Sequence, residues 1–496
     1  MLHLWNLEGN LLSSLFLLVV CGRFFAMRTL VLTIVMLCGI MVATRASERW
    51  DPDPPWDHQE KTYRPHFWPG KVDDVEGEVE LFWSPTGSAR ELSDLITNTP
   101  DHGWVDVGTP GFSSWIGCSY GGGCSVEEQK YNETFPIFPA LLNAIANGIS
   151  VRILTNDYER PPPSKGNIEP LTYLYLAGAD VKYYATTTFW HAKYIAVGPN
   201  ANANANANAK SPTDSSRSGS SAEKRATAIS SVNFSQTSFR KNREAGVILR
   251  GHQLEPILEL AADVFESDWE NGKAFTVDQV YSESQLKMIR DKEFLPVVIP
   301  KDEYFPGAFY APTTKADIRE TDVSLVVSPD YAFETIKAAL DATEHTFLLY
   351  IYQVTDVHLC AWLEEFASRS DHDLYLLVSY AIFDYTDYKT AQSCYYNLTR
   401  AGVHVRTTAP HLYSFSHQKL WITDNSTMWL STGNWSPSDY PKITDATIFP
   451  PFNHSSSAHP WIQANRDFTV AIDADEIVRA ALDVFDGDFH IGQDWH

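Results

Sequence analysis

The chain has 496 residues, of which 44% are hydrophobic, so it can bury one large core or two fused ones. Its 38 Lys and Arg residues are outnumbered by 62 Asp and Glu residues, giving a formal net charge of −24. This charge excludes a protein that grips nucleic acid by broad electrostatic attraction, which needs clustered cations. An anionic substrate must instead be held by a few cations in a pocket. The acidic balance suits an acidic or extracellular compartment.

The N-terminus has the pattern of an export signal. Arg28 precedes an apolar run over residues 30–42, and small residues up to Ala46 follow it. The run is shorter than the roughly 20 residues of a membrane span. We therefore predict a signal peptide over residues 1–46 and a location in the secretory pathway, in a lysosomal or vacuolar lumen or outside the cell. A further apolar stretch at 11–20 leaves a signal anchor open as the alternative.

The cysteines agree with export, because four remain once the leader is removed. We predict the disulfides Cys118–Cys124 and Cys360–Cys394. Free thiols or a metal site are the alternatives, but no CxxC motif or nearby histidine pair supports zinc. We therefore predict neither a metal nor a cofactor.

Six Asn-x-Ser/Thr sequons are present. Glycosylation is predicted at four of them: Asn132, Asn397, Asn425 and Asn453. The other two, Asn233 and Asn434, belong to the predicted pocket and are expected to stay unmodified.

The elements follow in chain order after an irregular strap over residues 47–76, which is rich in Pro, Trp and His. A first α/β unit is predicted over residues 77–272. Its pattern predicts helices at 137–147, 171–177 and 254–269, and strands at 151–154, 181–184, 192–197 and 245–249.

Residues 199–225 interrupt this unit with an Asn-Ala repeat and a Ser-rich tail. The segment lacks the apolar residues that would offset the entropy of ordering, so we predict a disordered insertion. Residues 273–320 are expected to be a connector. A second unit is predicted over residues 321–496, with helices at 332–340 and at the C-terminus, and strands at 346–352, 374–380, 403–406 and 468–472.

The two units are copies of one sequence pattern. His191-Ala-Lys193 is followed by Ser-Ser-Val-Asn233, and His417-Gln-Lys419 by Ser-Thr-Gly-Asn434. Behind them stand Asn-Arg-Glu244 in the first copy and Asn-Arg-Asp467 in the second. Blocks that recur in the same order indicate an internal duplication. His191 lies 42 positions before Asn233 but His417 only 17 before Asn434, and the excess of 25 matches the insertion.

Alternating strands and helices in each copy predict an α/β fold of two tandem sandwich units. We expect the units to pack as a pseudo-dimer with one shared active site and with both motif strands at the seam. Each histidine is expected on the same strand face as its lysine, two residues on.

On these residues the chain resembles the phospholipase D superfamily over about residues 77–496. The leader and the sequences ahead of each motif are most similar to its secreted and lysosomal branch, which implies a 5′ exonuclease on single-stranded nucleic acid. The family pattern also places an aspartate five residues after the lysine. Asp424 meets it as a structural residue, whereas Gly198 stands there in the first copy, which leaves an impaired half-site open.

Cleavage of a phosphodiester without a metal needs a nucleophile, an acid for the leaving group and cations around the transition state. The histidines can share the first two tasks, and the resemblance implies His191 as nucleophile and His417 as acid, an order that sequence alone leaves open. The other predicted catalytic residues hold phosphate oxygens or orient the histidines: Lys193, Lys419, Asn233, Asn434, Glu244 and Asp467.

The motif does not separate nucleic acid from phospholipid as the phosphodiester substrate. Aromatic residues near the motifs could stack on bases or belong to the core: Phe189, Trp190, Tyr413, Phe415 and Trp435. We favour a nuclease, with phospholipase second and a phosphate-ester-binding pseudoenzyme third. A homodimer is left open.

Overall fold

A computed structural model describes residues 67–112, 137–156, 170–184, 188–199, 225–270, 275–290, 310–441 and 464–495. These residues belong to one unit, residues 58–496. Several predicted features lie outside them: the leader, Cys118, Cys124, Asn132, Asn453 and the low-complexity insertion beyond Pro199. Within the described ranges, no helix has the length and apolar character needed to cross a bilayer.

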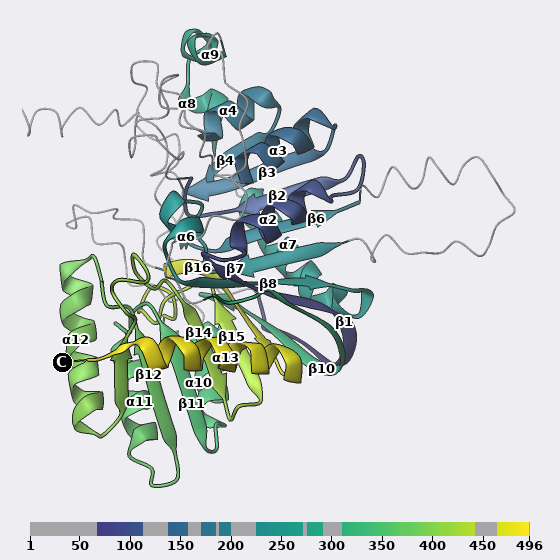
Figure 1. The fold of residues 1–496 in the computed structure, drawn as a ribbon. Helices are drawn as coiled ribbons and strands as arrows, with labels where there is room; N and C mark the ends of the chain where they lie inside the picture. Colours follow the sequence, from purple (N-terminus) through teal and green to yellow (C-terminus); the bar gives the residue numbers. More distant parts are fainter. Residues whose placement is uncertain are drawn as a thin grey trace, which may run out of the picture. The chain divides into compact units, whose positions relative to one another are not determined.

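The first half contains short strands alternating with helices (Figure 1). Its elements are β1 (Gly70–Ser84), α2 (Ser88–Thr97), β2 (Trp104–Gly108), α3 (Ile137–Ala146), β3 (Ser150–Asn156), α4 (Pro170–Ala177), β4 (Asp180–Tyr184), β5 (Thr188–Trp190), β6 (Lys193–Gly198), β7 (Ala226–Ser230), α6 (Gln236–Arg240), β8 (Glu244–Arg250), the 3-10 turn η4 (His252–Leu254), α7 (Glu255–Trp269), β9 (Phe275–Thr276), α8 (Val277–Val280) and α9 (Glu283–Arg290).

The second half repeats this alternation. Its elements are β10 (Thr314–Ser328), α10 (Ala332–Asp341), β11 (Thr346–Ile351), α11 (Val357–Ala367), β12 (Asp373–Val378), α12 (Tyr385–Arg400), β13 (His404–Thr407), β14 (Lys419–Thr423), β15 (Thr427–Ser431), β16 (Ala464–Ile472), α13 (Asp475–Ile491) and β17 (Gln493–Asp494).

Strand pairing has the same order in both halves, as the predicted duplication requires. The first half pairs as β4-β3-β2-β6-β7-β8-β1 and the second as β13-β12-β11-β14-β15-β16-β10. The antiparallel pair β1–β10 joins them, with Gly70 opposite Leu325. The short strands β9 and β17 extend β4 and β13, so even the outer ends correspond.

The long strands β1 and β10 correct two predicted boundaries. β1 begins inside the predicted strap and β10 inside the predicted connector, which also contains α8 and α9. The buried side chains of β10, such as Ala316 and Ile318, alternate with exposed charged ones. Half the strand is therefore polar, and the apolar signal on which the prediction depended is diluted.

The expected place of the motif strands is also wrong. β6 lies between β2 and β7, and β14 between β11 and β15, so neither strand forms the seam. The strands begin at Lys193 and Lys419, so His191 and His417 precede them in the chain rather than sharing a strand face with the lysines. The strand pairs that join the two halves are the long antiparallel pair β1–β10 and the short parallel pair β5–β16.

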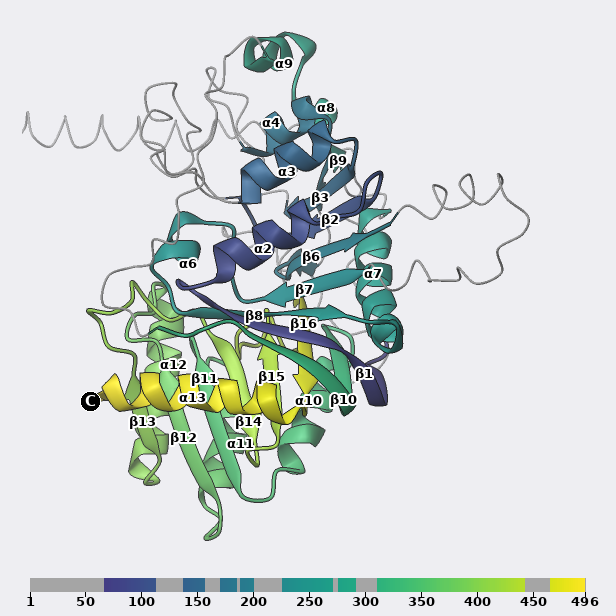
Figure 2. The same cartoon turned by 45° about the vertical axis from the view of Figure 1, so that its right-hand side comes forward.

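Helices cover both faces of the second-half strands, as predicted for an α/β sandwich. In β11, Leu348 and Tyr350 pack in the same core as α13, whereas Phe347, Leu349 and Ile351 pack with α10, α11 and α12. This alternation follows from the two-residue period of a strand. Figure 2 shows α13 lying across these strands. The core beneath α13 is continuous with the core beneath α7, so the halves share one apolar layer.

The predicted disulfide between Cys360 and Cys394 is present, with the Cα atoms 5.9 Å apart. It joins α11 to α12 beside the second-half core.

Candidate active site

Each histidine is positioned by the opposite half of the chain. The backbone N–H groups of His191 and Ala192 donate to the carbonyl of Arg466, at 3.0 and 2.8 Å. In the same way the N–H of His417 donates to the carbonyl of Arg243, at 2.9 Å. Because both arginines belong to the Asn-Arg-acid blocks, the acid after each arginine comes next to the histidine of the other copy.

The two arginines fix this crossed arrangement. Arg243 Nε donates to Asp488 at 2.7 Å and Arg466 Nε to Asp268 at 2.8 Å, and all four side chains are buried. Asp268 ends α7 and Asp488 lies in α13, so each pair joins one half to the other. Leaving one of these buried charges unpaired would be strongly destabilising, by about 3–5 kcal/mol. The two pairs therefore fix the position of one half relative to the other.

His417 is held at one ring nitrogen. Its Nδ1 lies 3.0 Å from Glu244 Oε2 and 3.0 Å from the carbonyl oxygen of Ser231. A carbonyl oxygen can only accept, so Nδ1 carries the hydrogen and Nε2 has the free lone pair. Burial and the positive charges of Lys419 and Lys193 lower the pKa of His417 well below its usual value, which keeps the ring neutral.

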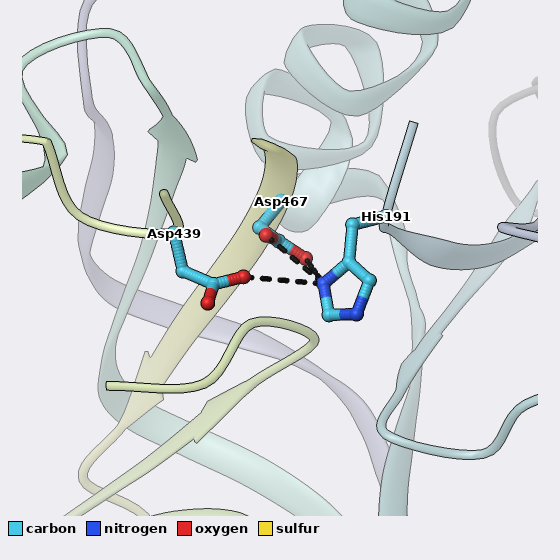
Figure 3. Close-up of side chains that lie close together, drawn as sticks. All are labelled: His191, Asp439 and Asp467. Carbon is cyan, nitrogen blue, oxygen red and sulfur yellow. Dashed lines mark hydrogen bonds and ion pairs between the residues drawn. The ribbon is translucent and has the colours of Figure 1, made fainter. Parts of the chain in front are cut away.

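His191 lies against two carboxylates (Figure 3). Its Nδ1 is 2.9 Å from Asp467 Oδ1 and 3.2 Å from Asp439 Oδ1. Burial opposes protonation, but the charge of Asp467 and the hydrogen bonds of both carboxylates outweigh it, so the pKa of His191 is raised. The two histidines therefore differ in basicity although they belong to copies of one motif.

Asp439 is a site residue that the sequence reasoning missed. Its Oδ1 accepts from Asn465 Nδ2 at 2.7 Å, and its Oδ2 accepts from Ser436. Burial disfavours ionisation of Asp439, but its hydrogen bond to His191 and the charge of that ring lower its pKa below the usual value. The corresponding residue five positions after the other motif asparagine is Ser238, so comparison of the two copies could have found this difference.

The lysines lie beside the histidines. Lys193 Nζ is 3.1 Å from His191 Nε2 and also donates to the carbonyl of Thr432 at 3.2 Å. Lys419 Nζ donates to the carbonyl of His417 at 2.9 Å. Burial lowers the pKa of Lys193 to about 8, against the charges of Asp467 and Asp439. Burial and the charge of Lys193 lower the pKa of Lys419 well below its usual value, so a bound anion would favour the charged form of both lysines.

The remaining predicted groups are the two motif asparagines and the two acids that contact the histidines. Asn233 and Asn434 each have a buried side-chain oxygen without a hydrogen-bond partner, in both half-sites alike. Glu244 is held by Asn242 Nδ2 at 3.1 Å, and burial, opposed mainly by the charge of Lys419, raises its pKa to about 7. Asp467 accepts from Thr432 Oγ1 at 2.6 Å.

Asp424 takes no part in the pocket. Its carboxylate accepts from the backbone N–H groups of Glu344, His345 and Thr346, at 2.9, 2.7 and 2.9 Å, and so fixes the start of β11. In the first half Gly198 stands against the ring of Trp104, where an added Cβ would lie 2.6 Å from the Trp104 Cζ2 atom. The absence of an aspartate in the first half therefore follows from packing against Trp104, at the end of β6 opposite to Lys193.

The aromatic residues near the motifs divide between core and site. Three of them are fully buried core residues: Trp190, Tyr413 and Trp435. Phe415 lies 5.9 Å from the ring of His417, and Phe189 lies 6.0 Å from that of His191. Tyr352, which the sequence reasoning did not single out, packs edge-on to His417 at 5.3 Å.

One group of side chains has the spacing of metal ligands. The ring nitrogen of His191 and carboxylate oxygens of Asp439 and Asp467 lie within 4.8 Å of one another. A nitrogen and two carboxylate oxygens could bind a divalent cation. The same atoms are already joined by the hydrogen bonds described above, which account for their positions without an ion.

Of the predicted glycosylation sites within the described ranges, Asn397 and Asn425 are exposed, on α12 and on the β14–β15 turn. Asn233 and Asn434 are partly buried.

The family model described as "Cardiolipin synthase, PLD-like domain" matches residues 129–269 and 336–488, which together are more than half of the chain. Each matched segment contains one His-x-Lys motif. Among curated proteins no sequence matches the chain.

Several solved structures are similar. Phosphatidylserine synthase from Haemophilus influenzae Rd KW20 is 9% identical with a TM-score of 0.48, covering 84% of this chain and 87% of that one. Nuc from Salmonella typhimurium, a phospholipase D family member, is 16% identical with a TM-score of 0.27, covering 36% and 99%. Polyphosphate kinase from Porphyromonas gingivalis is 11% identical with a TM-score of 0.44. That match covers 82% of this chain, which spans about half the length of the kinase.

Proposed function

The chain belongs to the PLD-like domain family described for cardiolipin synthase, a part of the phospholipase D superfamily, and on that premise we propose that it is a phosphodiesterase that works through a phosphohistidine. The observation that carries the proposal is the pair of histidines whose Nδ1 atoms are held by carboxylates of the opposite half. Two imidazoles so oriented can divide attack and proton donation between them. The two halves then act as a pseudo-dimer with one shared site.

We propose His417 as the nucleophile. Its Nδ1 hydrogen is fixed by Ser231 and Glu244, so Nε2 has the lone pair that attacks phosphorus. A bond forms between Nε2 and phosphorus while the bond from phosphorus to the leaving oxygen breaks. Glu244 stabilises the positive charge that develops on the ring.

His191 is the proton donor in this proposal. Asp467 and Asp439 favour its protonated form, so it can transfer a proton to the leaving oxygen. It then holds a free lone pair and takes a proton from water, whose oxygen attacks phosphorus and releases His417. This order is the reverse of the one that the family resemblance implies.

Lys193, Lys419 and the two asparagines bind the non-bridging oxygens. The ammonium groups neutralise charge that grows in the transition state. Without phosphate, the short contact between Lys193 Nζ and His191 Nε2 leaves these two groups competing for one proton. A phosphate oxygen gives both of them an acceptor. The side-chain amide groups of Asn233 and Asn434 can donate from Nδ2 to the same oxygens.

For the substrate we propose single-stranded nucleic acid cleaved from its 5′ end. Phe415 and Tyr352 place aromatic rings beside His417, where a base can stack. A phospholipid phosphodiester is the second candidate, supported by the family description. The export signal predicted from the sequence supports activity in a lysosomal or vacuolar lumen or outside the cell.

The test is to incubate the mature protein at acidic and neutral pH with 5′-hydroxyl single-stranded DNA and, in parallel, with phosphatidylcholine. We expect release of mononucleotides without choline, and near-complete loss of it in His191→Ala and in His417→Ala, since the two act as one relay. Choline release alone would favour the phospholipid. Inactivity on both substrates would favour a phosphate-ester-binding pseudoenzyme.

A further inference from the structure

Exposed aromatic side chains concentrate at one place. Across the described ranges nine large apolar or aromatic side chains are well exposed, and five of them lie between Tyr380 and Tyr396. Phe383 and Tyr385 are 72% and 73% exposed, and Tyr396 is 54% exposed. Burying such rings is favourable, so a cluster of them on the surface indicates contact with something outside the chain.

The aromatic residues of α12 share one face of the helix with cations. Tyr385, Tyr388, Tyr396, Lys389 and Arg400 recur at helical spacing and span about a third of the helix circumference. Lys389 Nζ lies 5.6 Å from the Tyr385 ring and 5.8 Å from the Tyr388 ring, and the Arg400 guanidinium lies 5.7 Å from the Tyr396 ring.

This face carries no carboxylate, in a chain whose net charge is −24. The one acidic residue within α12, Asp387, points elsewhere and accepts from Gln353 Nε2 at 2.8 Å. Rings interleaved with cations are what a single strand requires, because bases stack on rings while phosphates pair with cations. A helix that inserts an apolar face into a bilayer presents Trp, Phe or Leu there, whereas the large side chains on this face of α12 are tyrosines.

Aromatic side chains connect this face to His417. The ring of Phe383, just ahead of α12, packs edge-on to Phe415 at 5.0 Å, and Phe415 contacts His417. The N–H of Phe383 also donates to the Tyr352 hydroxyl at 3.2 Å, and the Tyr352 ring packs against His417. A strand with its reacting phosphate at the histidines can therefore pass over Phe415 and Phe383 onto α12.

We infer that the outer face of α12 is a binding track for single-stranded nucleic acid, leading away from His417. This inference rests on the proposed phosphodiesterase function and names the surface that holds the substrate. The track is about 24 Å long, from 16 residues at about 1.5 Å each, so it engages only substrates several nucleotides long.

The kinetic test compares kcat/KM for 5′-hydroxyl dT10 and for bis(p-nitrophenyl) phosphate, which is too small to reach α12. In Tyr385→Ala/Tyr388→Ala/Tyr396→Ala we expect the value for dT10 to fall at least about tenfold more than that for the small ester. Replacing the same tyrosines by Phe keeps the rings and should restore most of the activity on dT10. Tyr310→Ala removes an exposed ring outside α12 and should change neither value.

The binding test measures fluorescence anisotropy of 3′-labelled dT10 with His417→Asn, so that cleavage does not interfere. Adding Tyr385→Ala/Tyr388→Ala/Tyr396→Ala to this variant should weaken dT10 binding at least about tenfold. Lys389→Gln/Arg400→Gln should reduce the salt dependence of dT10 binding. If wild type fails on both phosphodiesters while dT10 still binds through α12, the proposed function is wrong and the track is retained. Equal losses on dT10 and the small ester, unchanged dT10 binding, or loss of binding only to phosphatidylcholine vesicles would each overturn the track.

Discussion

Asp439→Asn removes the charge that distinguishes the two half-sites while keeping the shape of the side chain. At 3.2 Å from His191 Nδ1, the carboxylate attracts the imidazolium by about 5 kcal/mol with an effective dielectric constant of about 20. The cost of burying Asp439 offsets part of this, and contacts of this kind shift a pKa by about 1–3 units. We expect the pKa of His191 to fall by about 1–2 units, or about 1.4–2.7 kcal/mol.

The assay is the pH dependence of kcat/KM for bis(p-nitrophenyl) phosphate. Asp439 favours the protonated form of His191, so its loss lowers the pH at which the acid loses its proton. The alkaline limb of the pH profile should therefore move to lower pH by about 1–2 units. Asp439→Ser, which introduces the residue found at the corresponding position Ser238 of the first half, should shift the limb in the same direction. Asp341→Asn, an exposed change on α10, is the control. An unmoved alkaline limb would refute the reasoning, and a shift of the acid limb instead would indicate that His191 is the nucleophile.

Four further outcomes are expected. EDTA should leave turnover unchanged, and loss of activity that a divalent metal restores would contradict the two-histidine chemistry. Asp424→Asn should lower the free energy of unfolding in urea by about 1–3 kcal/mol through weaker backbone hydrogen bonds, with kcat nearly unchanged; a lower kcat at normal stability would contradict its structural role. Gly198→Asp should destabilise the protein rather than raise activity, because its Cβ would meet Trp104, so a gain in kcat would count against this packing. Cys360→Ser/Cys394→Ser should cost about 3–4 kcal/mol of stability for a 34-residue separation, and an unchanged urea midpoint would show that the bridge contributes little.

The repeated blocks contain the residues that the structure places around the two histidines. His191, Lys193 and Glu244 each have a counterpart in the same order in the second half, and such a repeat is visible without a structure. The crossed pairing was not predictable in this way. A repeat says that Glu244 and Asp467 have one role, but only the backbone bonds from each histidine segment to the other half decide which acid serves which ring.

The missed residues show where a repeat misleads. Asp439 was overlooked because its counterpart in the first copy is Ser238, so the repeat does not point to it. Arg243 and Asp488 lie in blocks that were recognised, yet their pairing joins residues 245 apart, and no local pattern shows a contact at that separation. The start of β10 was missed for another reason, since its exposed half is charged and its apolar signal is weak.

The measurement that tests the central claim most directly is isolation of the covalent intermediate. A ³²P-labelled p-nitrophenyl phosphodiester, whose leaving group needs no proton from His191, is mixed with His191→Asn, in which release by water is slowed. The mixture is quenched in alkali to preserve phosphohistidine and digested with trypsin. We predict the label on His417, in the peptide of residues 407–419, located by fragmentation because that peptide also contains His411. In wild type a smaller amount should appear in the same peptide. Label in the peptide of residues 183–193 of wild type, which contains His191, or no covalent label in either protein during turnover, would contradict it.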